Sequence, residues 1–324
     1  MPAPVTHYQF ALRVLSYLKK YGVRVPDQNM ALIGAQGPDI FFFHRILPWE
    51  RGTSYAFVGS KLHRSSPALI FEGFRDILNS QDSHYDAILS YVQGMFCHYA
   101  LDRAAHPYIY WAQNKLAQDD PTYGINGHQY HFRIESALDT IILRRETGRL
   151  ISSLNLIDVL PGDTNSRYGI IGLVYHKLLI KLFSLDVPPE LLALAPKDMR
   201  HALFFMNDRA MLRQKLIFRP IEKLARHGHF FTSLIRPHDT TDWDYANVSN
   251  TKWVNPYDEM YISTDSFFDL YYMAVKEAID MISDFVCALP DGKSMHEITQ
   301  DRGFASDLPG IYTGQPSTLS RDDS

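Results

Sequence analysis

Two rows of histidine and carboxylate residues are the part of this sequence best suited to chemistry. In the segment FCHYALDRAAHPYI, His98, Asp102 and His106 follow one another at intervals of four residues. Each such step drifts by only about 40° around a helix, so the three side chains would share a face about 80° wide. Imidazole and carboxylate groups are typical zinc ligands. The segment is otherwise apolar, and buried polar groups need partners, so this row is a candidate metal site.

A second row of the same kind follows in the segment HFRIESALDT, where His131, Glu135 and Asp139 are again four residues apart. If the two helices run antiparallel side by side, both rows can point into one cleft and form a cluster of metal ligands. His128 is an alternative to His131, but His131 has the better spacing to Glu135. Asp139 could instead be an acceptor that orients a ligand histidine.

The elements that must position these rows are helices. Apolar residues recur with helical periodicity over most of the chain, and we predict an all-α protein. The expected helices cover about 6–21, 67–79, 84–112 with an end near Pro107, 128–147, 168–185, 189–195, 198–226 and 264–289. Strand patterns are confined to 248–254 and 260–263. The segments 34–65 and 237–261 are rich in aromatic residues, and we expect them to pack over the helices without being helical themselves.

The length of 324 residues is enough for one large domain or two ordinary ones. We expect a metal-site-bearing half at 1–160 and a C-terminal helical half at 161–290, packed with the first as one domain. A break near Pro161 separates the halves. From 291 to 324 the composition turns polar, which favours a loose tail.

Composition narrows the class of protein. The net charge of −4 gives no basic excess, which argues against a nucleic-acid partner. No apolar run approaches the ~20 residues of a membrane span, so a membrane contact could only be peripheral. Cys97 and Cys287 are far apart in the chain and are expected to be free thiols in a reducing compartment. The first residues, MPAPVTHYQF, show no secretory signal, and we predict a cytoplasmic protein.

Several motifs occur together in a characteristic order. His7 in THYQF comes first, followed by Asp39 in GAQGPDIFFF and His63 in GSKLHRSS. The run HYALD with a later His-Pro pair follows, and then HxxxE with an Asp-Thr pair. This ordered set resembles the zinc-dependent phospholipase C family, which is related to the S1/P1 nucleases. The resemblance covers residues ~5 to 140, and it implies a helical bundle with a cluster of three zinc ions between its helices.

The resemblance also implies roles for single residues. It assigns His63, His98 and Asp102 to one zinc, His106, His131 and Glu135 to a second, and His7 to a third, with Asp102 bridging the third to the first. Asp39 would be the catalytic carboxylate that positions or deprotonates the attacking water. Bound zinc lowers the pKa of water from 15.7 towards ~7, which makes a nucleophile available at neutral pH.

Three departures from the family pattern leave alternatives open. The secreted relatives complete the third zinc site with a processed N-terminal residue, commonly tryptophan, which this chain lacks. A Pro2 amine could substitute if Met1 is removed; otherwise the site holds two metals, or side chains or water close the third position. The gap from Asp102 to His106 is shorter than in the secreted enzymes. His44 competes with His63 for the loop-ligand role, and we favour His63.

The sequence therefore predicts a zinc-dependent hydrolase with two or three Zn²⁺ ions. We expect phospholipase C-like cleavage of a phosphodiester by a metal-activated water, on a small phosphodiester or a phospholipid headgroup. An S1/P1-like nuclease is the alternative enzyme; Glu135, where the nucleases prefer aspartate, and the absence of their Gly-Gly-Asn signature argue against it. A metal-binding relative without catalysis is the third possibility. The substrate, the oligomeric state and the role of the aromatic segment 237–261 stay open.

Overall fold

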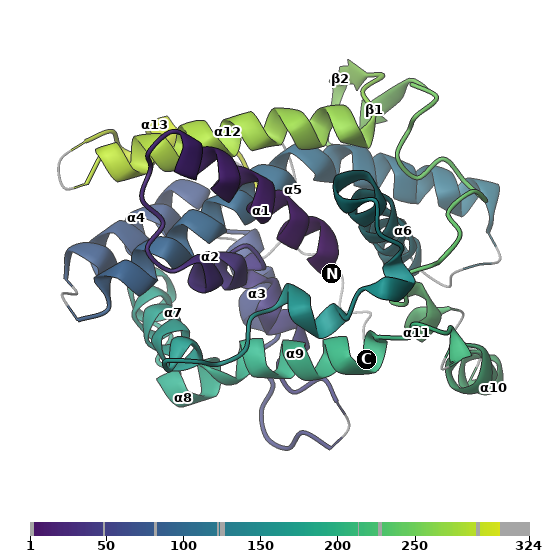
Figure 1. Cartoon of the computed structure of the whole chain (residues 1–324), viewed down its shortest axis with the longest axis horizontal. Coiled ribbons are helices and arrows are strands. Elements are labelled where there is room, and N and C mark those ends of the chain that lie inside the picture. Colours follow the sequence, from purple (N-terminus) through teal and green to yellow (C-terminus); the bar gives the residue numbers. More distant parts are fainter. Residues whose placement is uncertain are drawn as a thin grey trace.

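The computed structural model describes residues 3–47, 49–80, 83–121, 123, 127–212, 214–225, 229–289 and 292–304. These residues form thirteen α-helices and one two-stranded sheet (Figure 1), so the predicted all-α class is confirmed. The α-helices are α1 Pro4–Lys20, α2 Gln28–Gly34, α3 Phe57–His63, α4 Pro67–Asn79, α5 Tyr85–Asp119, α6 Gly127–Thr147, α7 Arg167–Phe183, α8 Pro189–Leu192, α9 Leu194–Met206, α10 Arg219–Ala225, α11 Phe230–Ser233, α12 Phe267–Cys287 and α13 Met295–Thr299. The short elements are the 3₁₀ helices η1 Gly37–Phe43, η2 Ile151–Ser153 and η3 Leu156–Val159, the π-helical η4 Gln214–Phe218, and the strands β1 Trp253–Asn255 and β2 Asp258–Ser263.

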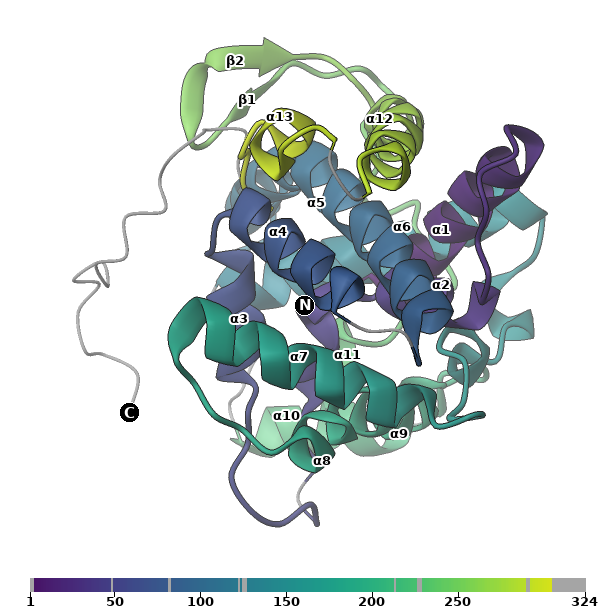
Figure 2. The same cartoon turned by 90° about the vertical axis from the view of Figure 1, so that its left-hand side faces the viewer.

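Helix α5 is the centre of the molecule. Figures 1 and 2 show it surrounded by other helices, and it packs against α1, α2, α6 and α12. Every residue from Ile88 to Arg103 is buried, so this helix has no solvent face over more than four turns. A helix that is buried all round is normally apolar all round. The histidine and the aspartate within this stretch, His98 and Asp102, must therefore find their partners inside the protein.

The end of α5 differs from the prediction. We expected the helix to end near Pro107, but it continues to Asp119. A proline inside a helix costs about 3 kcal/mol. Tyr108, Ala112 and Leu116 are buried on the continuing turns, and burying three such side chains offsets that cost. His106 therefore stays on the same straight element as the other ligands of its row.

The segment 34–65 is helical over Gly37–Phe43 and Phe57–His63, which corrects the prediction that it contains no helix. It contains η1 and α3, and both pack against each other. Gly37 has φ of +56°, and a Cβ there would lie 2.3 Å from Cδ2 of His98. Only glycine allows the η1 backbone to lie against this ring. The segment does pack over the helices as expected, and it brings Asp39 and His63 to α5.

One prediction for the C-terminal half is corrected, and another, short strands at 248–254 and 260–263 in a non-helical segment, is confirmed. The single helix expected over 198–226 is broken, because α9 ends at Met206 and the chain turns at Asn207, whose Nδ2 donates to Oδ1 of Asn155 at 2.9 Å. The segment 237–261 forms part of a hairpin in which Val254 pairs with Ile262. Trp253 is fully buried against Tyr108 of α5, so this tryptophan anchors the hairpin to the core.

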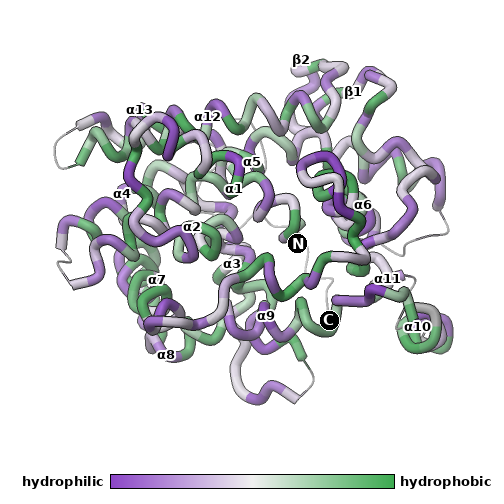
Figure 3. The backbone as a smooth tube through the Cα atoms, viewed as in Figure 1, coloured by the Kyte–Doolittle hydropathy of each residue, from purple (hydrophilic) through white to green (hydrophobic). Residues whose placement is uncertain are grey.

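The start of the expected tail is packed, unlike the prediction. α13 packs on α4 and α12, and Met295, Ile298 and Phe304 are buried. The remainder, 305–324, lies outside the described residues, and the division of the chain near residue 160 stays a prediction. Figure 3 shows apolar and polar residues alternating along the helices. Among the described helices, none is long and apolar enough to cross a membrane. Cys97 and Cys287 are both free, as predicted, and the cytoplasmic location stays a prediction.

Candidate metal centre

Asp102 is the centre of a group of histidines drawn from three helices. Its Oδ2 lies 3.1 Å from Nε2 of His98 and 3.6 Å from Nε2 of His63, and its Oδ1 lies 3.3 Å from Nε2 of His7. Asp39 adds a second carboxylate, with Oδ1 at 3.2 Å from Nε2 of His63. All of these side chains are wholly or largely buried, so a single cluster of nitrogen and oxygen donors lies between α1, α3, α5 and η1.

Three histidines of the centre are oriented by bonds on their outer nitrogen. Nδ1 of His63 contacts the carbonyl oxygen of Gly59 at 2.8 Å, and Nδ1 of His106 contacts that of Phe304 at 3.0 Å. Nδ1 of His131 lies 3.2 Å from Oε1 of Gln113. Oxygen acceptors at these positions place the proton on Nδ1, which leaves the Nε2 lone pair for a metal. Such outer bonds are a usual accompaniment of ligand histidines.

The donor atoms fall into three groups whose members lie within 4.8 Å of one another. The groups are His63, His98 and Asp102; His106, His131 and Glu135; and His7, Asp39 and His98. Zinc bonds of about 2.0–2.1 Å at tetrahedral angles place two ligand atoms about 3.3–3.4 Å apart. Nε2 of His98 and Nε2 of His63 are 3.3 Å apart, and so are Nε2 of His131 and Oε1 of Glu135. The spacing of the donors therefore fits zinc.

The facing ring nitrogens support the same conclusion. Nε2 of His63 and Nε2 of His98 face each other at 3.3 Å and need a proton or a cation between them. Nδ1 of His7 and Nδ1 of His98 are buried and have no hydrogen-bond partner among the described residues, so these two rings lack the outer bond that orients the other three. A zinc ion held by three protein ligands would keep a fourth position for water or substrate, as in catalytic zinc sites.

The sequence model of the family described as zinc-dependent phospholipase C matches residues 6–178, more than half of the chain. The chain belongs to the zinc-dependent phospholipase C family. No curated protein and no solved structure matches it. Every candidate ligand from His7 to Glu135 lies within the matched residues. Membership supports zinc and phosphoester hydrolysis as properties of the family and names no substrate for this chain.

The structure brings together all eight residues singled out in the sequence. The first two groups coincide with the ligand sets expected from the resemblance to the phospholipase C family, namely His63, His98 and Asp102 and then His106, His131 and Glu135. The third group differs, because Asp39 lies beside His7 and His98 and is itself placed as a possible ligand. The assignment of each residue to a metal stays a prediction. Met1 and Pro2, on which the terminal-amine alternative depends, lie outside the described residues.

The two alternative histidines lie apart from the centre. Nε2 of His44 lies 2.9 Å from the carbonyl oxygen of Leu191, and its Nδ1 accepts from the backbone N–H of Tyr55. With both ring nitrogens bonded to backbone, His44 has no lone pair left for a metal. His128 is exposed and stacks on Phe132. The geometry favours His63, at the end of α3, and His131.

Burial and proximity set the charges of the metal-free centre. Burial would raise the pKa of Asp102, but His98 and His106 outweigh it and hold this pKa well below its usual range. Burial likewise opposes the ionisation of Asp39, yet His98 and His63 lower its pKa to about 2. Burial lowers the pKa of His63, but hydrogen bonds to Asp102 and Asp39 raise it to about 10. Both carboxylates are therefore ionised at neutral pH. Without a metal ion, the protonated His63 ring supplies part of the positive charge that balances them.

Asp139 bonds to Thr6 and Arg236 and not to a ligand histidine, which was the partner considered from the sequence. It contacts no histidine ring among the described residues. Its Oδ1 accepts from the backbone N–H of Thr6 at 2.8 Å and from the Thr6 hydroxyl at 2.9 Å, and its Oδ2 accepts from Nε of Arg236. Thr6 is the residue before His7, so Asp139 fixes the start of α1 against α6. Arg236 carries no signal of this pairing in the sequence.

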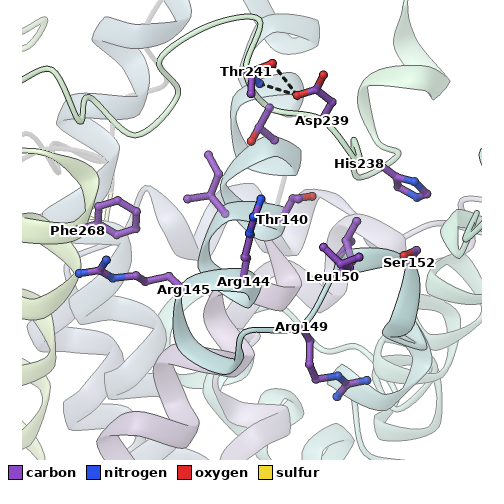
Figure 4. A pocket seen from close by; sticks show the side chains of 13 residues that line it. Thr140, Arg144, Arg145, Arg149, Leu150, Ser152, His238, Asp239, Thr241 and Phe268 are labelled. Carbon is purple, nitrogen blue, oxygen red and sulfur yellow. Dashed lines mark hydrogen bonds between the residues drawn. The ribbon is translucent and has the colours of Figure 1, made fainter.

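The two large surface cavities contain none of the candidate ligands. One of about 520 Å³ lies beyond the C-terminal half of α6 and is lined by three arginines (Figure 4). The guanidinium of Arg145 lies over the ring of Phe268, and Arg149 donates to the carbonyl oxygen of Ser153, so two of the three are engaged elsewhere. Asp239 in the same cavity accepts from the backbone of Thr241. His238 and Asp239 are adjacent in this loop, and neither belongs to a group of possible metal ligands among the described residues.

Zinc binding at neutral pH is expected to release about one proton from His63, because the ligand form of histidine is neutral. The metal-free pKa of about 10 keeps this ring protonated before zinc arrives. Calorimetric titration with zinc in buffers of different ionisation enthalpy measures the release. His63→Asn should release about one proton fewer than the wild type, and an equal release would contradict the assignment.

The raised pKa of His63 also makes the stability of the metal-free protein depend on pH. A pKa raised in the folded state means that the protonated His63 stabilises the fold. This contribution is complete below the unfolded pKa of 6.5 and is lost as the pH rises through about 10. The affinity for zinc should change in the opposite sense and weaken as the pH falls, since protons compete with the metal.

Proposed function

We propose that this protein hydrolyses phosphodiester bonds with two or three zinc ions, in the manner of a phospholipase C, on a small phosphodiester or a phospholipid headgroup. The observation that carries the proposal is the convergence of two complete histidine–carboxylate groups and Asp39 around Asp102. Membership of the phospholipase C family supports zinc and a phosphoester substrate class. No observation favours the nuclease alternative.

Zinc bound there would supply a Lewis acid for the phosphoryl oxygen and lower the pKa of water towards ~7. The chain's own residues hold and orient these components. Asp102 contributes negative charge at the centre of the group, where it would offset the mutual repulsion of neighbouring cations. The Nδ1 bonds of His63, His106 and His131 keep Nε2 aimed inward. The buried setting excludes bulk water, which strengthens each of these electrostatic contacts.

Asp39 is assigned to positioning the attacking water. In the metal-free centre its pKa of about 2 keeps it ionised at neutral pH. An ionised carboxylate can accept a hydrogen bond and so orient the water's lone pair towards phosphorus. Its contact with His63 fixes where that acceptor lies. Deprotonation of the water by Asp39 is the alternative role.

Asp39→Asn tests the proposal. We expect bis(p-nitrophenyl) phosphate hydrolysis to fall about 10²-fold or more, within the range of positioned acid–base groups. Elemental mass spectrometry should find the same two or three zinc ions per chain as in the wild type. Asp86→Asn, at an exposed carboxylate on the same protein, is the control and should keep full activity.

Three outcomes would contradict parts of this proposal. Full activity of the Asp39→Asn variant would remove the positioning role. Loss of one zinc from the variant would make Asp39 a ligand. A wild-type protein that holds zinc and cleaves no phosphodiester would be a metal-binding relative without catalysis.

A further inference from the structure

From the end of α9 through α10, apolar side chains are exposed while an acidic side chain is buried. Leu216 and Leu224 are 71% and 89% exposed, and Leu212, Ile217 and Ile221 are exposed as well. The acidic residue Glu222 is only 3% exposed, and its carboxylate accepts from the backbone N–H and the hydroxyl of Thr232 at 2.8 and 2.9 Å. A surface helix normally turns its apolar side inward and its charges outward. The outward apolar side chains therefore suit an apolar environment outside the protein.

The charge of the segment indicates which environment. Residues 209–225 contain five basic residues and one acidic residue, although the whole chain has a net charge of −4. Arg209, Arg219 and Lys223 are exposed and form no ion pair with a described residue. Exposed leucines flanked by basic residues are typical of segments that lie in the interface of an anionic membrane. A nucleic-acid surface would match the charge but not the leucines.

A second exposed apolar group adjoins the first along the chain. Trp49, from the loop between η1 and α3, is 58% exposed and contacts Phe205 at the end of α9, with ring centroids 5.1 Å apart. Ile46 of the same loop is also exposed. This loop and α10 both lie on the lower side of the molecule in Figures 1 and 2. Tryptophan favours the headgroup region of membranes, so the loop extends the same surface.

This surface is connected to the metal centre by hydrogen bonds. Glu222 holds α10 to Thr232 of α11. The hydroxyl of Ser136 donates to the carbonyl oxygen of Ser233 at 2.7 Å, which ties α11 to α6. Ser136 follows Glu135 directly in the chain. A contact made at α10 is thus two short links from the helix that carries two candidate metal ligands.

We infer that the described residues of 204–224 and of the loop around Trp49 form a docking surface for an anionic phospholipid membrane. The inference rests on the proposed function, because it takes a phospholipid as the substrate class. The apolar side chains enter the interface, and the basic side chains contact the phosphate groups. Residues 204–224 lie beyond the part matched by the family, residues 6–178, whereas the loop around Trp49 lies within it.

Co-sedimentation of the full chain with lipid vesicles tests the inference. We expect binding to phosphatidylcholine vesicles that contain about one-third phosphatidylglycerol, and much weaker binding to pure phosphatidylcholine. Leu216→Ser/Leu224→Ser should abolish binding. Arg219→Gln/Lys223→Gln should weaken it about 25-fold, since each basic residue near an anionic surface contributes about fivefold. Leu69→Ser/Met260→Ser removes two equally exposed apolar side chains elsewhere and should bind as the wild type does.

A soluble substrate separates docking from catalysis. The Leu216→Ser/Leu224→Ser variant should hydrolyse bis(p-nitrophenyl) phosphate at the wild-type rate and lose hydrolysis of vesicle phospholipid. Vesicle binding without cleavage of any phosphoester would support docking and contradict the proposed function. Cleavage of the soluble substrate without vesicle binding would overturn the docking inference and leave the hydrolase standing.

Two further results would overturn the inference. Equal vesicle binding by Leu216→Ser/Leu224→Ser and its control would show that the docking surface takes no part. A wild-type dimer in sedimentation velocity that this double variant converts to a monomer would make the surface a contact between two copies of the chain.

Discussion

Asp102→Asn is expected to remove zinc from the centre and to abolish phosphodiester hydrolysis. The carboxylate lies within 3.1–3.6 Å of Nε2 atoms of His98, His7 and His63. Asparagine keeps the shape but loses the charge that balances the cations. Removing an outer-shell partner alone costs ~10–100-fold in metal affinity, and loss of a central ligand should exceed ~100-fold. This is the largest expected effect on activity of any single substitution in the chain.

Elemental mass spectrometry on protein purified without chelator measures the loss. We expect two or three zinc ions per chain in the wild type and at most one in the variant. Asp86→Asn is the matched control, because Asp86 lies on the same helix and pairs with Arg24 at the surface. Circular dichroism should show equal helix content in all three proteins. Full zinc content in the variant would exclude Asp102 as an essential ligand, whereas a wild type that binds no zinc would reduce the family membership to a likeness of fold.

The ligand rows could be predicted because helical geometry is local. Once 98–106 is a helix, the spacing of four residues alone places His98, Asp102 and His106 on one face. The expectation that 84–112 is helical is sufficient for that conclusion, even though the predicted end at Pro107 is wrong. Tertiary packing of elements far apart in the chain brings this row together with His7, Asp39 and His63. Only the resemblance to the family, and not spacing, brought these three into the predicted site.

The residues that sequence reasoning missed act through backbone or through distant partners. The carbonyl oxygen of Phe304 accepts a hydrogen bond from His106. Because every residue has a backbone carbonyl, the sequence cannot indicate which one makes this contact. The ring of Phe304 also lies against His63 and His98, with centroids 5.3 and 6.0 Å away. Polar composition favoured a loose tail here, yet one buried phenylalanine outweighs it. Local propensity could not reveal this contact across almost two hundred residues.

In the segment 198–226 the sequence did not indicate which side chains are buried. Its apolar residues predicted one helix, and periodicity does not tell which side of a helix faces the core. In the structure the apolar side chains of α10 face outward and Glu222 faces inward. What decides this is the pairing of Glu222 with Thr232, ten residues away, and the break at Asn207. Patterning predicted that the segment is helical, and only tertiary contacts show which face is buried.

Asp139→Ala is expected to produce the largest loss of stability. Asp139 is fully buried and accepts from Arg236, whose side chain is only 4% exposed. Removing one partner of a buried ion pair costs about 3–5 kcal/mol, because the other charge is left without compensation. With an entropy of unfolding of about 2.1 cal/mol/K per residue, this corresponds to a fall in Tm of about 4–7 °C. Asp86→Ala, at an exposed pair, should cost about 0–1 kcal/mol.

Measurements on metal-free and zinc-loaded protein separate the two roles of Asp139, which are to stabilise the fold and to support zinc binding. Its bonds to Thr6 hold the residue before His7, so Asp139→Ala should weaken zinc binding in addition to lowering Tm. Differential scanning calorimetry without zinc measures the first effect, and calorimetric zinc titration below the melting transition measures the second. A lower Tm with unchanged zinc affinity would limit Asp139 to holding α1 on α6. An unchanged Tm would mean that the buried pair with Arg236 contributes nothing to the fold, contrary to its burial and geometry.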